Sequence, residues 1–413
     1  MRCALLLGLC LCAPRGTAEI AVNSPPGKGP ASRLIRGEVM QVASMGELRR
    51  AIERANHDAQ PATILLADGV YVLDVSHLHL DCPGLVIRGA RGNREAVTIR
   101  GPNEGPSATA THVFLVSADD VVIADLTLGY CRCHGIQVQG ERPHDVAGLR
   151  VSNCRLVNCN EQFIKGSSSD DDPVGATDGC IENCLFEFTS GWAYQFYTGG
   201  IDIHKGVNWV VRHNLFRNLR LRDSGGGLTE HAIHFWKRCP TRPQNLVVER
   251  NWIVNCDRGI GFGLSHTEGG LQGGGSVIRN NFVFNDGSGP RTDVGIGLEA
   301  ADGVRVENNT VVVQGYWAPV EYRFPASTNL VFRNNLVNGP ITQRDGAPAA
   351  NRERNLQRIE SGWFRDLPAG DLHLTRTATA AIDQALELEG FAEDLDADPR
   401  PRQAGWDIGA DEF

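Results

Sequence analysis

The chain has 413 residues, enough for two or three average domains, although repeat folds grow by stacking and escape that limit. Hydrophobic residues make up 41% and charged residues 22%, and 47 glycines against 3 methionines favour many tight turns over long helices. The formal charge of −9 leaves no basic field for nucleic acid, which is therefore not expected as a partner. An acidic protein that binds a polyanion needs a local cationic site or a bridging metal.

The first 18 residues have the pattern of a signal peptide. Arg2 gives a charged start, Ala4–Cys12 is an apolar run, and Gly16–Ala18 is a small-residue cleavage site. The apolar run is too short to span a bilayer, and no later segment is long or apolar enough to do so. We expect a secreted or periplasmic protein without a membrane span, with residues 19–36 as a Pro/Gly-containing linker.

A short helix is predicted after this linker. Ser44 and Glu47 have the three-residue spacing of a capping box. The apolar residues that follow share one helix face: Met45, Leu48, Ala51, Ile52 and Ala55. Such a helix can close the end of a larger apolar core, so we expect an N-terminal cap.

From Ile64 onward the chain consists of short β-rich runs that are separated by Gly, Asn and Asp and that repeat. Aligning the runs gives one column: Leu126, Cys154, Cys184, Asn214, Asn251, Asn281, Asn309 and Asn335. Successive spacings are 28, 30, 30, 37, 30, 28 and 26 residues, and the column two positions later is apolar throughout. Coils of this length stack in parallel about 4.8 Å apart, which predicts a ladder of hydrogen-bonded Asn side chains.

The repeat predicts an all-β solenoid over residues 37–345, with residues 346–413 finishing the last coils and covering the C-terminal end of the core. A leucine-rich repeat also ends strands with Asn, but its L-x-x-L-x-L signature and its tighter period are missing. The repeat, the cap helix and the ending Gly405–Phe413 resemble secreted bacterial proteins of the pectate-lyase-like superfamily. This resemblance implies a right-handed parallel β-helix. It leaves the chemistry open, because that superfamily includes lyases, hydrolases, esterases, epimerases and adhesins.

A further strand follows the Asn column in each coil, and its alternation places Ile and Val inward and two rows of side chains outward. The first row is Gln137, Phe163, Asp202, His234, Gly261, Gly297 and Glu321, and the second is Gln139, Lys165, His204, Trp236, Gly263, Glu299 and Arg323. A slip by one residue would reverse every assignment. These rows contain the residues that we consider for a functional site.

Three outward glycines, Gly261, Gly263 and Gly297, predict a trough whose floor has no side chains. Trp236 beside it offers a flat surface on which a sugar ring can stack. The remaining predicted substrate-binding residues carry charges that suit hydroxyl or carboxylate groups: Lys205, Lys237, Glu299 and Arg323. The competing interpretation is an ordinary solvated sheet face with glycines at strand bends.

Lys165 and His204 are expected in adjacent coils of one row, with Asp202 and His234 paired in the other. Elimination at a uronic-acid glycosidic bond needs a base, an acid for the leaving oxygen and a cation for the enolate-like intermediate. These four residues are therefore our catalytic candidates. A hydrolase is not supported, because Asp202 and Glu299 lie three coils apart, about 14 Å, whereas hydrolysis needs two carboxylates closer together.

The strand Asn160–Ser167 resembles the catalytic-lysine strand of the chondroitinase B and alginate lyase family, which implies that Lys165 is the base. An Arg follows one coil later in that family, where this chain has His204 and Lys205. The calcium-binding acidic pair of that family has no clear counterpart. A run of three acids, Asp170, Asp171 and Asp172, offers an alternative calcium site or is simply a solvated loop.

The leading hypothesis is a monomeric polysaccharide lyase that acts by β-elimination on an acidic, uronic-acid-containing polysaccharide, or a C5 epimerase that shares the proton-abstraction step. The alternative is a non-catalytic carbohydrate-binding or surface-attachment solenoid that uses Trp236 and the glycine floor without turnover. Calcium is the only cofactor that the sequence suggests.

Overall fold

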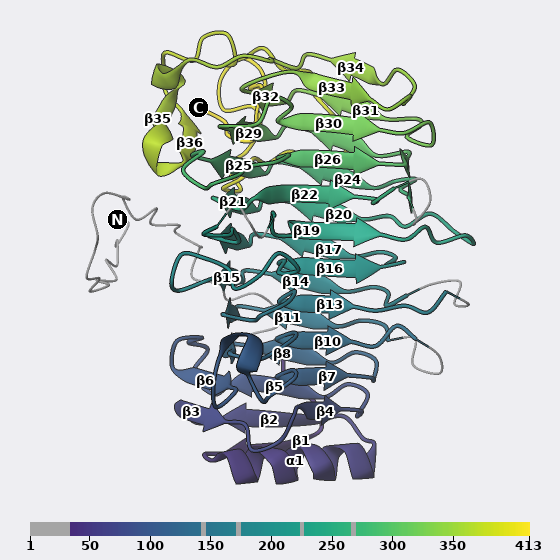
Figure 1. Cartoon of the computed structure of the whole chain (residues 1–413), viewed down its shortest axis with the longest axis vertical. Helices are drawn as coiled ribbons and strands as arrows, with labels where there is room; N and C mark the ends of the chain where they lie inside the picture. The colour runs from purple at the N-terminus through teal and green to yellow at the C-terminus, as the bar shows by residue number, and fades with distance from the viewer. Residues whose placement is uncertain (1–33, 142–145, 171–174, 224–226, 266–269) are drawn as a thin grey trace.

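The computed structural model describes residues 34–141, 146–170, 175–223, 227–265 and 270–413 (Figure 1). The predicted signal peptide and most of the predicted linker lie outside the described residues, as do Asp171 and Asp172. Within the described part of the chain, no helix has the length and apolar character needed to cross a membrane.

Three long parallel sheets form the molecule, and each coil of the chain contributes one strand to each of them in turn. Sheet I has twelve strands: β1 (Glu38–Val42), β2 (Ala62–Leu66), β5 (Val86–Gly89), β8 (Val122–Ala124), β11 (Arg150–Ser152), β14 (Cys180–Glu182), β17 (Val210–Arg212), β20 (Val247–Glu249), β24 (Val277–Arg279), β28 (Arg305–Glu307), β31 (Val331–Arg333) and β34 (Asn351–Glu353). Sheet II has ten: β3 (Gly69–Val72), β6 (Val97–Arg100), β9 (Thr127–Gly129), β12 (Arg155–Val157), β15 (Leu185–Glu187), β18 (Leu215–Arg217), β21 (Trp252–Val254), β25 (Phe282–Asn285), β29 (Thr310–Val313) and β32 (Leu336–Val337).

Sheet III also has ten strands: β4 (Leu78–Leu80), β7 (Phe114–Val116), β10 (Ile136–Val138), β13 (Ile164–Gly166), β16 (Ile201–His204), β19 (His231–Trp236), β22 (Arg258–Phe262), β26 (Ile296–Glu299), β30 (Val320–Arg323) and β33 (Ile341–Arg344). The remaining elements are short: β23 (Leu271–Gln272), β27 (Ala301–Asp302), β35 (Phe364–Asp366), β36 (Asp371–Leu374) and the single-turn helices η2 (Gly105–Ser107), η4 (Ser361–Trp363) and η5 (Leu367–Ala369). This is the right-handed parallel β-helix that the repeat and its resemblance imply.

Rows of identical residues hold the coils in register. Inside the helix, Ile164, Ile201, Ile233, Ile260 and Ile296 pair in successive strands of sheet III and are fully buried. At the corner between sheets I and II, each Asn side chain donates from Nδ2 to Oδ1 of the next one at 2.8–3.0 Å, in the order Asn214, Asn251, Asn281, Asn309, Asn335 and Asn355. These bonds satisfy amide groups that would otherwise be buried without partners, so the row supports both stacking and polar satisfaction.

Helix α1 (Met45–Asp58) closes the N-terminal end of the stack, at the purple end of Figure 1. Ser44 Oγ accepts from the Glu47 amide at 3.3 Å, and the Glu47 carboxylate accepts from the Ala43 amide at 2.8 Å. The face that packs on the first coil buries four of the five predicted residues: Leu48, Ala51, Ile52 and Ala55. The predicted N-terminal cap is thus confirmed.

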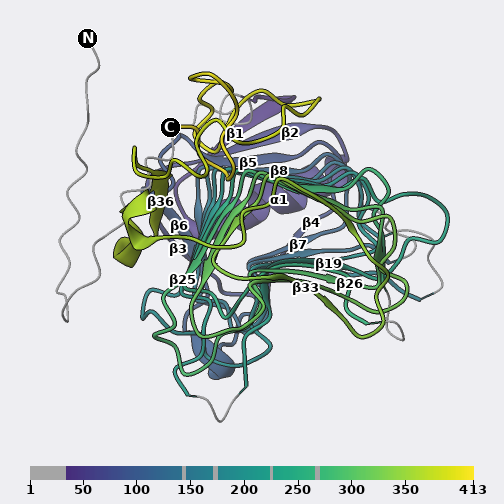
Figure 2. The same ribbon diagram turned by 90° about the horizontal axis from the view of Figure 1, so that it is seen from above.

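The C-terminal segment does more than finish the last coils. Its first residues form β34, as expected, but residues 360–413, here called the flap, pack on the outer face of sheet II instead of covering the end of the core. Figure 2 shows β36 outside the stack, beside strands of sheet II. Backbone contacts fix the flap there, because the Gly409 amide donates to the Asn334 carbonyl at 2.8 Å. The reason is that two adjacent outer rows on sheet II carry apolar side chains that need burial: Trp252, Phe282 and Leu336 in one row, and Val254, Phe284 and Val312 in the other.

Candidate functional site

The outer face of sheet III carries the candidate site, and its central row differs from the predicted one. Lys165 pairs in register with Asp202, and Asp202 pairs with His234, so these three residues share one row. The prediction placed Lys165 two positions away, in the row of His204, and placed Phe163 outward, whereas Phe163 is fully buried in the core. Alternation determines which face a residue is on, but it cannot distinguish two alignments of neighbouring strands that differ by two residues. In β16 both Ile201 and Ile203 face inward, so either one could have been aligned with Ile164.

Lys165 lies between two partners. Its Nζ is 2.5 Å from Asp202 Oδ2 and 2.9 Å from His204 Nε2. The three side chains are only 8%, 8% and 12% exposed, respectively. Although the predicted rows were wrong, the structure brings the predicted base, carboxylate and histidine into direct contact.

Trp236 and His234 complete this cluster. The Trp236 indole donates to Asp202 Oδ1 at 2.8 Å, and its ring meets the His204 ring edge to face with centroids 4.3 Å apart. His234 Nε2 donates to the Gly263 carbonyl at 2.9 Å, while its Nδ1 lies 3.9 Å from Asp202 Oδ1. Trp236 is therefore held by its polar edge, and His234 is tied to the backbone.

The protonation states follow from burial and charge. Burial alone would raise the pKa of Asp202, but contacts with His204 and the charge of Lys165 hold it well below its ordinary value. Burial lowers the pKa of His204 and also that of His234, which keeps both imidazoles neutral near pH 7. A neutral His204 accepts the hydrogen bond from Lys165 at Nε2, so a proton can pass between the two nitrogens beside a fixed negative charge.

Two predicted cationic residues hold a neighbouring loop. Lys205 Nζ donates to the carbonyls of Ser169 and Asp170 at 2.8 and 3.0 Å. Lys237 Nζ lies 3.3 Å from the carboxylate of Asp170 and 5.4 Å from the centroid of the Trp236 ring. Asp170 thus has a lysine as its partner, and the two other acids of the predicted calcium run lie outside the described residues.

The predicted glycine trough is not open. All three glycines are buried. A Cβ on Gly261 would meet the ring of His231 at 2.6 Å, and one on Gly297 would meet Val294 at 3.2 Å. Gly263 has a φ of +81°, and a Cβ there would meet the carbonyl of Glu299 at 1.7 Å. The glycines therefore serve close packing of neighbouring groups instead of exposing a bare floor.

Glu299 and Arg323 form a separate cluster. They face each other in neighbouring strands, and Glu299 lies two coils beyond Trp236. Arg323 bonds Glu299 at 3.0 Å and Asp345 at 2.5 Å. Burial raises the pKa of Glu299 to about 7, in spite of the charge of Arg323. The structure does not join this pair to the Lys165 cluster.

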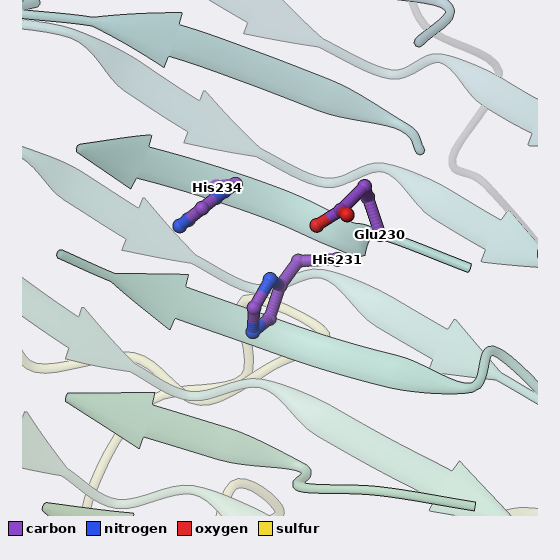
Figure 3. A group of neighbouring side chains, drawn as sticks. All are labelled: Glu230, His231 and His234. Carbon is purple, nitrogen blue, oxygen red and sulfur yellow. The ribbon is translucent and has the colours of Figure 1, made fainter. Parts of the chain in front are cut away.

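The predicted site residues did not include Glu230 and His231, which lie beside His234 and next to the cluster (Figure 3). Ala232 and Ile233 both face the core, so His231 and His234 can both face outward in spite of their odd spacing. A third omission is Tyr197, whose ring centroid is 6.0 Å from Lys165 Nζ. The available signal was the run Glu-His-x-x-His, which does not follow strand periodicity.

No protein-family model matches the chain, and no curated protein matches it by sequence. Among solved structures, pectate lyase Pel9A superposes with a TM-score of 0.61 at 13% identity, covering 92% of this chain and 98% of that one.

Two other structures are less similar. The A-module of a mannuronan C-5 epimerase from Azotobacter vinelandii gives a TM-score of 0.40 at 12% identity, covering 76% and 95% of the two chains. A mannuronic acid-specific family 6 lyase from human gut microbiota gives 0.43 at 13% identity, covering 81% and 85%. The chain thus shares with pectate lyase Pel9A the right-handed parallel β-helix fold.

Proposed function

We propose that the protein is an enzyme that removes the proton beside the carboxylate of a uronic-acid residue in an acidic polysaccharide, as a lyase or as a C5 epimerase. One observation carries the proposal: the amine of Lys165 contacts both Asp202 and His204 on the outer face of sheet III. This places a proton acceptor, a second proton carrier and a counter-charge within one small cluster.

Lys165 is the base in this proposal. The Lys165 ammonium that pairs with Asp202 first loses a proton to solvent; the neutral amine then takes the proton from carbon, and the C–H electron pair forms an enolate-like intermediate on the sugar carboxylate. The resulting ammonium is stabilised where it forms, because Asp202 and His204 both accept hydrogen bonds from it. In a lyase the intermediate then forms a carbon–carbon double bond and breaks the bond to the leaving oxygen, which takes a proton. In an epimerase the same carbon is reprotonated on its other face.

His204 is the candidate acid, because it shares a proton with Lys165 and retains some exposure. His234, a further predicted catalytic residue, is better suited to a positioning role. Its side chain is 3% exposed and its Nε2 is bonded to the Gly263 carbonyl, so it cannot reach a substrate oxygen from this position. Trp236 positions Asp202 through its indole and offers the remainder of its ring to a sugar.

The shared fold supports this proposal at the level of architecture, since Pel9A is named as a pectate lyase. Secretion into the periplasm or the medium, which the N-terminal pattern predicts, would bring the protein to such polymers. A negatively charged protein must bind them through a local cationic group, and Lys237 can exchange its solvent-facing partner Asp170 for a uronate carboxylate.

The test is incubation of the purified protein with alginate, pectate, glucuronan and glycosaminoglycans, monitoring the ultraviolet absorbance of unsaturated uronate products. We expect a rise on one polymer class that Lys165→Ala abolishes. Arg91→Ala is the matched control, because it removes an exposed cation near the N-terminal end, where the side chain is 77% exposed. Thermal melting establishes that each variant is folded.

Epimerisation is tested in parallel by deuterium incorporation from heavy water into the same polymers, measured by NMR. Incorporation without absorbance, again lost in Lys165→Ala, assigns the epimerase. If neither signal is found while glycan binding persists in Lys165→Ala, the proposal is overturned in favour of a non-catalytic binding module.

A further inference from the structure

We propose that Glu230, His231 and His234 form a binding site for a divalent transition metal of the zinc class. Each residue offers one ligand atom, and these atoms all lie within 4.8 Å of one another (Figure 3). Ligand atoms around a tetrahedral zinc lie roughly 3 to 4 Å apart. Closing the site therefore needs movements of about an ångström, and the Glu230 side chain, which is 27% exposed, has room to turn.

His234 is already oriented as a ligand. Its Nε2 must carry the hydrogen, because it donates to the Gly263 carbonyl at 2.9 Å. In the neutral ring the lone pair is then on Nδ1. Histidines that bind metals usually donate their other ring N–H to a carbonyl or carboxylate, which fixes both tautomer and orientation. The Gly263 carbonyl fulfils that role here.

His231 supplies the second nitrogen. Its Nδ1 is buried and has no hydrogen-bond partner among the described residues, which is costly unless a ligand satisfies it. The ring lies over Gly261, where a Cβ would come within 2.6 Å of it. Gly261 therefore admits His231 to this position, which gives the buried glycine a specific role.

Glu230 supplies the negative charge of this ligand set, and its present partner can be replaced. Arg258 Nη1 lies 3.7 Å from the Glu230 carboxylate, but the Nε of the same side chain is bonded to Asp293 at 3.0 Å. Glu230 can therefore turn from Arg258 to an ion without leaving that arginine unpaired.

The donor set selects the kind of metal. Two imidazole nitrogens and one carboxylate are the three protein ligands of a typical catalytic zinc site, which leaves a fourth position open. Calcium needs six to eight oxygen ligands and is disfavoured by this set. His234 Nδ1 lies 3.9 Å from Asp202 Oδ1, so the ion would adjoin the Lys165 cluster. A role in binding the sugar carboxylate rests on the proposed function, whereas ion binding itself does not.

The experiment is calorimetric titration of the chelator-treated full chain with Zn²⁺, followed by titration with Co²⁺ and recording of its visible absorption. We expect one site, an absorption band typical of four-coordinate cobalt, and at least a tenfold weaker affinity in both Glu230→Gln and His231→Ala. His57→Ala is the matched control and should bind like the wild type, since His57 is 88% exposed and distant in the chain. Gly261→Ala keeps every ligand but should weaken binding by displacing the ring of His231.

No zinc binding by the folded wild type would overturn the proposal, and so would equal affinity in Glu230→Gln and His231→Ala. Loss of binding in His373→Ala alone would place the ion at the other candidate group, His373, Asp396 and Asp411, and would also overturn it. Because binding is measured by heat and by cobalt absorption, an inactive protein that binds zinc refutes only the proposed enzymatic activity.

Discussion

The outer faces of sheets II and III are built from the same parallel arrangement of strands but carry different kinds of side chains. On the strands of sheet II from β21 to β32 most of the outward side chains are large and apolar, and the flap buries them with its own apolar residues, including Trp363 and Leu372. On sheet III the outward row contains Lys165, Asp202 and His234: the first two form an ion pair, and His234 donates to the Gly263 carbonyl. Both faces remove their side chains from water, but by different interactions.

The difference separates a structural face from a candidate functional one. Apolar contacts with the flap lower the free energy of the fold and need no ligand. A buried ion pair is a poor source of stability, because desolvation of the charges offsets most of their attraction. Charges held together at such a cost, beside an exposed aromatic such as Tyr197 (40% exposed), are better explained by a reaction or a ligand than by stability.

The largest expected effect on stability is on the structural face. Phe282→Ala should lower the free energy of unfolding by about 3 to 5 kcal/mol, because it leaves a cavity between sheet II and the flap. Phe196→Ala is the matched control. That side chain is 56% exposed, and its loss should change stability by less than about 0.5 kcal/mol. Urea denaturation measures both, and equal effects would refute the distinction between the faces.

On the charged face, Asp202→Asn should lower the free energy of unfolding at pH 7 by about 1.5 to 3 kcal/mol, since it removes a charged hydrogen-bond partner of Lys165. The pKa of Asp202 is lower in the folded than in the unfolded state, so ionised Asp202 stabilises the fold. This stabilisation is present above the unfolded-state pKa and is lost as the pH falls through the folded-state pKa. The difference between wild type and variant should therefore shrink in acid. A difference that stays constant from pH 7 to acid would contradict this account.

The flap should dock less tightly as the pH rises. Burial would lower the pKa of His373, but hydrogen bonds with Asp371 and Asp396 raise it to about 10. Because the pKa of His373 is higher in the folded than in the unfolded state, protonated His373 stabilises the fold. This stabilisation is fully present below the unfolded-state pKa and is lost as the pH rises toward about 10. Burial raises the pKa of Asp411 to about 6, so protonated Asp411 also stabilises the docked flap, and this stabilisation is lost as the pH rises toward about 6.

Hydrogen exchange in β35 and β36 should accordingly be faster, after correction for its intrinsic pH dependence, at pH 9 than at pH 6. Exchange in sheet III is the internal control and should change less. A His373→Gln variant that showed the same pH response as the wild type would exclude this histidine as the cause.

The smallest effect is expected at the rim of the charged face. Lys237→Ala removes an ion pair with Asp170 in which the two side chains are 22% and 94% exposed, respectively, and should lower the free energy of unfolding by only about 0.2 to 1 kcal/mol. Thermal denaturation at low and high salt measures it, and the difference should vanish at high salt. A cost above that of Asp202→Asn would reverse the ranking of buried and exposed charges.

The fold was predictable because its determinants are periodic in the sequence. The Asn column from Asn214 to Asn335 and the inward Ile rows recur once per coil, so one correct alignment defines the whole stack. The candidate site was predictable only in part. Lys165, Asp202, His204, His234 and Trp236 were identified and lie together, but the row of Lys165 was wrong.

The errors have physical causes. Strand β13 has only three residues, and a period of two cannot distinguish a register from one shifted by two positions. The glycines of sheet III were interpreted as a trough because the sequence does not show that His231 and Val294 occupy the space above them. His231 was left out because the chain departs from alternation at Ala232 and Ile233, and Glu230 because it precedes strand β19.

The sequence by itself determined the coil, its repeat length, the N-terminal cap and the set of polar residues on one sheet face, because these depend on local period and composition. The tertiary structure decided which of those residues meet, where the flap lies, and that Glu230 and His231 join His234. These contacts link residues in different coils, or depend on a local break in the strand pattern. Their geometry is set by stacking register and packing, which no local pattern encodes.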